Sequence, residues 1–255
     1  MSRHRWVPTT RLLASAADPE PAGLTGTAAA LNERGLRCKA AADYDEARAF
    51  YERALSLLKS GPAPDPNDVA TLYHNLGGVE HARGDYVAAE AFAVLGLAVR
   101  LGRGAADPLA VAADMVALAA ILDGQGRYDE AEPLYVEALG VYERSPRADA
   151  LDVAAALNDL GAQYAARGLY DRAEELLERA VALKRQALGD RHPDVAVTLN
   201  NLALTYKRRH EAERAATLYR EALDILEAAL GPDHPKTVTC RANAARCSGA
   251  HTPLP

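Results

Sequence analysis

The sequence predicts an all-α protein built from repeated helix pairs, and three observations lead to this fold class. A block of sequence recurs five times at a period of 42 residues, without insertion or deletion. Large apolar residues within each block follow the i, i+3, i+7 spacing of one helix face. Hydrophobic residues make up 49% of the chain but aromatic residues only 5%, so the core is built mainly from small side chains. Such a core favours closely packed helices over a sandwich or a barrel.

The first helix of each block begins with a large apolar residue, and a small residue follows four positions later. The large residues are Leu31, Tyr73, Met115, Leu157 and Leu199. The small residues are Gly35, Gly77, Ala119, Gly161 and Ala203. We expect the small residue to let the second helix of the pair approach closely.

A short turn and a second helix complete each block. The turn contains Gly84, Gly126 or Gly168 in three copies, and glycine permits the positive φ that ends a helix tightly. The second helix carries alanine at one recurring position, namely Ala47, Ala89, Ala131, Ala173 and Ala215. Enlarging one of these alanines should cost about 1–3 kcal/mol through overpacking.

The period divides the chain into repeats at about 28–69, 70–111, 112–153, 154–195 and 196–236. A sixth copy begins at His234-Pro235, but Arg241 and Ala244 replace two leucines, so residues 237–247 are predicted to form a C-terminal capping helix. Residues 1–26 fall outside the period and are expected to form a disordered or partly helical leader. Residues 248–255 are expected to form a flexible tail.

These features resemble the tetratricopeptide repeat, in particular the kinesin light chain type. The resemblance covers residues 27–247 and is carried by the period, by Leu-Asn-Asn-Leu-Ala at 199–203 and by Leu-Gly-Asp-Arg-His-Pro at 188–193. It implies an α-α superhelix of five helix-pair repeats with a capping helix, whose concave face is an extended binding surface. Arg34, Glu80 and Ala93 depart from the family pattern, so we expect repeats one and two to be the least stable locally.

The register of the repeats places ten candidate binding residues on the concave side of the first helices. They are His74, Asn75, Asn158, Asp159, Asn200, Asn201, Lys207, Arg208, Asn243 and Arg246. Asn75, Asn201 and Asn243 share one position, and a side-chain amide can both donate and accept a hydrogen bond. In the family that the chain resembles, an asparagine there typically contacts the backbone of a bound extended peptide.

The remaining positions of this face suggest what the partner looks like. Val116, Ala117 and Ala120 of repeat three are small and apolar, which would leave room for a ligand side chain. Lys207, Arg208 and Arg246 add positive charge, which favours an acidic segment.

Two structural interpretations of these residues stay open. The asparagines could instead bond to the neighbouring helix and hold adjacent repeats in register. The basic residues from Lys207 to Arg209 could be a solvated helix end that complements the helix dipole.

No catalytic, cofactor or metal site is predicted. His74 and His81 lie seven residues apart and lack a third ligand. Three cysteines cannot form a disulfide framework, and free thiols indicate a reducing, cytoplasmic compartment. The net charge of -6 argues against a nucleic-acid face, and no apolar run reaches the roughly 18–20 residues of a membrane span.

The leading hypothesis is therefore a non-catalytic, monomeric scaffold that holds an extended or helical segment of a partner protein. The alternative is a regulatory or sensor module that acts with a separate effector or nucleotide-binding protein. A third hypothesis is self-assembly through stacked repeat ends, against which the polar capping helix argues.

Overall fold

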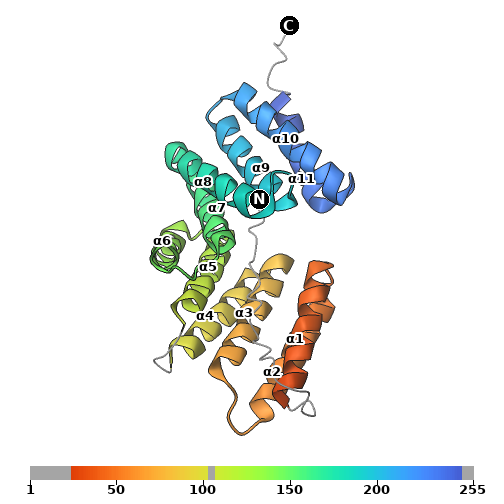
Figure 1. Ribbon diagram of the computed structural model, residues 1–255, viewed down its shortest axis with the longest axis vertical. Helices are drawn as coiled ribbons and strands as arrows, with labels where there is room; N and C mark the ends of the chain where they lie inside the picture. The colour runs from red at the N-terminus through yellow and green to blue at the C-terminus, as the bar shows by residue number, and fades with distance from the viewer. Residues whose placement is uncertain (1–23, 103–106, 249–255) are drawn as a thin grey trace. The chain divides into compact units, whose positions relative to one another are not determined.

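A computed structural model describes residues 24–102 and 107–248, which form eleven helices and contain no strand (Figure 1). The first helices of the pairs are α1 (Leu24–Ala40), α3 (Pro66–Arg83), α5 (Pro108–Gly124), α7 (Ala150–Ala166) and α9 (Pro193–Arg208). The second helices are α2 (Tyr44–Ser60), α4 (Tyr86–Leu101), α6 (Tyr128–Arg144), α8 (Tyr170–Leu188) and α10 (Ala212–Leu230), and α11 (Pro235–Ser248) follows. Five helix pairs and a terminal helix confirm the predicted all-α fold class.

The helices form two compact units, one with α1–α6 up to Ser145 and one with α7–α11 from Pro146. In each unit, both helices of a pair pack against each other, and each second helix also packs against the next first helix. First helices contact one another as well: α3 touches α1 and α5, and α9 touches α7 and α11. Residues 1–23 of the predicted leader and 249–255 of the predicted tail lie outside the described residues.

Small residues bring the helices of each pair together, as predicted. The recurring alanines from Ala47 to Ala215 have no exposed surface, and a large side chain four residues later is equally buried in most repeats. A Cβ atom added at Gly35 would lie 2.5 Å from the Tyr51 ring, and one at Gly161 would lie 2.8 Å from Leu177 Cγ. The α1–α2 and α7–α8 contacts therefore need glycine at these positions.

The turn inside each pair uses the same left-handed backbone in all five repeats. Gly84, Gly126 and Gly168 have φ values of 84°, 78° and 81°, which confirms the predicted glycine turns. Ala42 and His210 occupy the equivalent position with φ of 64° and 65°. Two repeats thus place a side chain where the backbone favours glycine.

Four of the first helices, α3, α5, α7 and α9, begin at side-chain caps. The Asp65 and Asp149 carboxylates accept hydrogen bonds from the amides of Asn67 and Leu151, each at 2.8 Å. His192 Nδ1 accepts from the Asp194 amide at 3.1 Å, and Pro193 occupies the first turn of the helix. The His-Pro pair of this linker is therefore a helix start, with His192 as the cap and Pro193 in the first turn.

Two departures from the family pattern are matched by new contacts. Glu80 is buried at the repeat position where later repeats carry Leu122, Tyr164 and Tyr206. Its carboxylate pairs with Arg48 of α2 at 2.9 Å and with Arg83 at 3.5 Å. Arg34 lies 4.7 Å above the Phe50 ring, a cation–π geometry.

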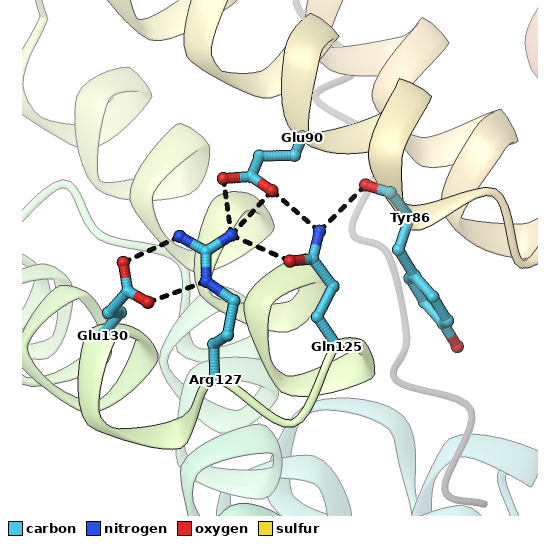
Figure 2. A network of polar contacts seen from close by, with 5 residues as sticks. All are labelled: Tyr86, Glu90, Gln125, Arg127 and Glu130. Carbon is cyan, nitrogen blue, oxygen red and sulfur yellow. Dashed lines mark hydrogen bonds and ion pairs between the residues drawn. The ribbon is translucent and has the colours of Figure 1, made fainter.

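A network of polar side chains joins α4 to the turn between α5 and α6 (Figure 2). The Arg127 guanidinium donates to Glu90 at 2.8 Å and to Glu130 at 2.7 Å, so it bridges two helices. Gln125 Nε2 donates to Glu90 at 2.8 Å and to the Tyr86 carbonyl at 3.2 Å. The Gln125 amide and the Arg127 guanidinium lower the pKa of Glu90, and Arg127 also lowers the pKa of Glu130.

Candidate functional site

Asparagine side chains join neighbouring first helices at three places. Asn75 Nδ2 donates to Asn32 Oδ1 at 2.8 Å, between α3 and α1. The other two bonds run from Asn201 to Asn158 at 3.0 Å, between α9 and α7, and from Asn243 to Asn200 at 3.1 Å, between α11 and α9. Each bond joins residues 43 positions apart, one more than the period of 42. The donor is the third residue of its copy of the five-residue segment that stands at 199–203 in repeat five, and the acceptor is the second residue of the preceding copy.

These bonds give the asparagines the stacking role that the sequence left open. The three asparagine pairs are nevertheless not equivalent, because they differ in how deeply their residues are buried. Asn32 and Asn75 are 3% and 0% exposed, and Asn158 and Asn201 are 3% and 8% exposed. Asn200 and Asn243 are only half-buried, so this pair alone among the three reaches the surface of its unit.

The half-buried pair also has unused hydrogen-bonding capacity. Asn243 Nδ2 donates to Asn200 Oδ1, which leaves Asn200 Nδ2 as a donor and Asn243 Oδ1 as an acceptor. If both side-chain amides are rotated so that their oxygen and nitrogen atoms exchange places, the pair again keeps one donor and one acceptor that are not used in the bond between them. In contrast, the buried Asn158 uses both of its groups, since its Nδ2 donates to Asp159 Oδ1 at 3.0 Å.

Three basic side chains lie on the two helices, α9 and α11, that carry the half-buried pair. Lys207 Nζ donates to the main-chain carbonyl of Asn243 at 3.1 Å. Arg208 is exposed and donates to the Ala165 carbonyl in the last turn of α7 at 2.7 Å, where a cation complements the helix dipole. Arg246 is exposed in the last turn of α11. Arg208 therefore has the dipole-complementing contact of the helix-end interpretation. Lys207 is half-buried, and Arg208 and Arg246 are exposed, so all three cations lie near the surface.

The predicted residue His74 belongs to a buried polar cluster rather than to an exposed face. Its Nδ1 lies 2.9 Å from Asp114 Oδ1 of α5, and Arg100 Nε of α4 donates to Asp114 Oδ2 at 2.5 Å. All three side chains are at most 5% exposed. Burial opposes ionisation of Asp114, but His74 and Arg100 outweigh it and hold the pKa of the carboxyl below its usual value.

The sequence reasoning missed this cluster, although the period contains its signal. We call residues that share one position of the 42-residue period a column. The column of Arg100 also holds Leu58, Tyr142 and Leu226, and the column of Asp114 also holds Leu72 and Ala156. Two repeats later, Lys184 occupies the Arg100 position and donates to Thr198, the counterpart of Asp114, at 2.6 Å. A charged residue in an otherwise apolar column, matched by a polar residue 14 positions later, would have revealed both pairs.

The small face expected in repeat three is closed. Val116, Ala117 and Ala120 are 7%, 6% and 2% exposed, so they form part of the core and not a pocket. Nearby, Tyr135 Oη donates to Asp123 Oδ2 at 3.2 Å. The expected room for a ligand side chain is therefore wrong, because the neighbouring side chains fill it.

No group of three histidine, cysteine or acidic side chains suited to a metal ion occurs among the described residues. Cys38 and Cys240 are free, and burial raises the pKa of the Cys240 thiol to about 12. Within the described ranges, no helix combines the length and the apolar character that crossing a membrane requires.

The profile of the tetratricopeptide repeat family matches the chain in three overlapping stretches, residues 68–144, 109–186 and 152–228. No curated protein sequence matches the chain.

Several solved structures share the fold. BtubC (BKLC) from P. vanneervenii is 28% identical, with 80% of this chain and 81% of that chain covered and a TM-score of 0.63. A putative kinesin light chain from Podosopora anserina with nearly identical TPR-like repeats is 20% identical, with coverages of 79% and 95% and a TM-score of 0.59. NprR in complex with its cognate peptide NprX is 17% identical, with coverages of 91% and 65% and a TM-score of 0.71.

Proposed function

Since the chain belongs to the tetratricopeptide repeat family, we propose that it is a non-catalytic scaffold that holds an extended segment of a partner protein against its first helices. The partner segment would lie along α9 and α11, where Asn200, Asn243, Lys207, Arg208 and Arg246 are accessible or half-buried. The buried Asn158, Asp159 and Asn201 of the same unit would support this surface by holding α7 and α9 in register. Asn75 and His74 belong to the other unit, where we assign them the structural contacts with Asn32 and Asp114.

One observation supports this proposal above the others: the half-buried side chains of Asn200 and Asn243 are bonded to each other and still keep one free donor and one free acceptor. The backbone of an extended peptide offers one carbonyl and one N–H per residue. The two side-chain amides would therefore bind one peptide residue through a pair of hydrogen bonds, independently of its side chain.

The nearby charge supports an acidic segment. Lys207, Arg208 and Arg246 lie on the helices that carry the amide pair. Lys207 and Arg208 donate to main-chain carbonyls. Because a carbonyl has no formal charge, these hydrogen bonds do not compensate the positive charge of the two side chains as a carboxylate would. Binding should consequently weaken as salt rises, because exposed charges are screened over about 10 Å at 0.1 M ionic strength.

The test uses the purified chain and an array of extended 12-residue peptides that vary in acidic content. The strongest binder is then titrated by calorimetry against wild type, Asn200→Ala/Asn243→Ala and Asn200→Asp. Asn200→Asp keeps the acceptor for Asn243, removes the free donor and adds a negative charge that also opposes an acidic peptide. We expect each variant to bind about tenfold more weakly, since each loses one or two hydrogen bonds.

A matched control is Gln186→Ala, which removes an exposed amide from the outer helix α8. It should bind like wild type, and the melting temperatures of all variants should show that they are folded. Equal binding by wild type and both asparagine variants, or an equal loss in Gln186→Ala, would contradict the proposal.

A further inference from the structure

The outer face of α4 is apolar along its whole length. Val87, Val94, Leu95 and Leu101 are 79%, 49%, 46% and 53% exposed, which makes them four of the seven exposed large hydrophobic side chains in the described residues. Ala91 and Ala98 are exposed between them. We call these six residues the α4 stripe.

The other repeats show that an apolar stripe is not a property of the fold. At the position of Val87 they carry Asp45, Asp129, Asp171 and Glu213. At the position of Leu95 they carry Arg53, Glu137, Arg179 and Glu221, and at the position of Leu101 they carry Lys59, Glu143, Arg185 and Glu227. Every one of these twelve residues is charged, so three charged positions are apolar in α4 alone.

The stripe has the spacing of a helix that pairs with another helix. Val87, Ala91, Val94, Ala98 and Leu101 are separated by four, three, four and three residues, the a/d pattern of a coiled coil. Valine and alanine alternate along it. In an antiparallel pair of identical helices with its two-fold axis between Ala91 and Val94, each valine faces an alanine of the other copy, because Val87 meets Ala98 and Ala91 meets Val94.

Charge also favours a second copy as the occupant. The stripe offers no charge to a charged partner face, and the exposed faces of α2, α6, α8 and α10 all carry charged side chains. α4 is therefore the one second helix of the described residues whose outer face matches the stripe in charge. Glu90, the one acidic residue of α4, is turned to the α5–α6 turn, where it forms an ion pair with Arg127 and accepts a hydrogen bond from Gln125 (Figure 2).

We propose that the α4 stripe is a self-association surface that pairs with the α4 stripe of a second copy of this chain in antiparallel orientation. One helix of 16 residues is about 24 Å long, so the contact is smaller than a standard interface and the dimer is weak, with a dissociation constant on the order of micromolar. The dimer would replace the monomer that the sequence led us to expect.

Analytical ultracentrifugation of the full chain tests this proposal through four samples, each measured from about 1 to about 500 µM. Wild type should rise from 27.2 kDa toward twice that mass as concentration increases. Val94→Glu and Ala91→Lys should each stay at the monomer mass. Their equimolar mixture should recover dimers, because the antiparallel register brings position 91 of one copy beside position 94 of the other, where the two introduced charges are opposite.

The control is Val136→Glu on α6, which introduces the same charge at the equivalent exposed position of the next repeat and should dimerise like wild type. Unchanged melting temperatures would show that the variants are folded. A monomeric wild type would overturn the proposal, and it is the result expected if another segment or another protein covers the stripe. A dimer that survives Val94→Glu, or a mixture that stays monomeric, would also overturn it.

Discussion

Single backbone positions show where this sequence departs from its own pattern. The turn inside each pair needs a left-handed residue, and three repeats supply glycine there. Ala42 and His210 adopt the same φ with a side chain, which costs roughly 1–2 kcal/mol for an L-residue.

Replacing Ala42 with glycine should therefore stabilise the folded chain by about 0.5–1 kcal/mol, after the larger entropy of glycine in the unfolded chain is subtracted. Urea unfolding measures this difference. The matched control is Ala41→Gly, one residue earlier in the same exposed turn, where φ is not positive and no gain is expected. A loss of stability in Ala42→Gly would contradict the strain at this position.

At this scale the sequence predicted the residue types but not their partners. The register identified Asn75, Asn201 and Asn243 as equivalent, yet each bonds to a residue of the preceding repeat that is offset by one position. The carbonyl acceptors of Lys207 and Arg208 lie on neighbouring helices and leave no trace in the side-chain pattern. Accessibility separates the Asn200–Asn243 pair from the other two, and it depends on the packing of whole helices.

Contacts between helices explain why small residues recur in the pairs. Gly35 should not tolerate a methyl group, since its Cβ would meet the Tyr51 ring at 2.5 Å. We expect Gly35→Ala to lower the free energy of unfolding by about 1–3 kcal/mol.

The control for this change is Gly140→Ala on α6, where the added Cβ would meet only the flexible end of Arg144 at 3.1 Å. There the higher helix propensity of alanine should stabilise the chain by up to about 1 kcal/mol. Thermal or urea unfolding of both variants gives the comparison, and equal effects at the two sites would contradict the close-packing argument.

The buried Arg100–Asp114 pair links α4 to α5 and offers a second test between elements. Asp114→Leu alone should cost about 3–5 kcal/mol, because it leaves the Arg100 charge buried without its partner. The double variant Arg100→Leu/Asp114→Leu recreates the Leu58–Leu72 combination found between repeats one and two and should recover most of that loss. A double variant that is less stable than the single variant would show that the ion pair itself stabilises the fold.

For the whole molecule, the period, the helical spacing of large apolar residues and the small-residue core together predicted the all-α class, the five helix pairs and the terminal helix. The description as two units, α1–α6 and α7–α11, does not follow from the period, because the spacing stays constant across the boundary. The sequence shows the α4 stripe through Val87, Leu95 and Leu101, which are apolar at three positions where the other four repeats carry charged residues. It was missed because the prediction concentrated on the first helices.

Stability of the folded chain should depend on pH through carboxylates whose pKa is lowered in the native state. For Glu90 the Gln125 and Arg127 contacts lower the pKa, so its contribution is present above the ordinary value of about 4 and is lost as the pH falls through the lower folded value. Glu90→Gln should therefore melt below wild type at pH 7, and the gap should shrink below about pH 4. Glu137→Gln, on the exposed face of α6, is the matched control, and a gap that widens in acid would contradict this assignment.

The accessible Asn200–Asn243 pair is the centre of the proposed binding mode, and side-chain amide NMR tests its role directly. The side-chain NH2 signals of Asn200 and Asn243 should shift when the strongest array peptide is added, while those of the buried Asn32 and Asn75 should not. A bound peptide that leaves the Asn200 and Asn243 signals unchanged would contradict the proposed mode of binding.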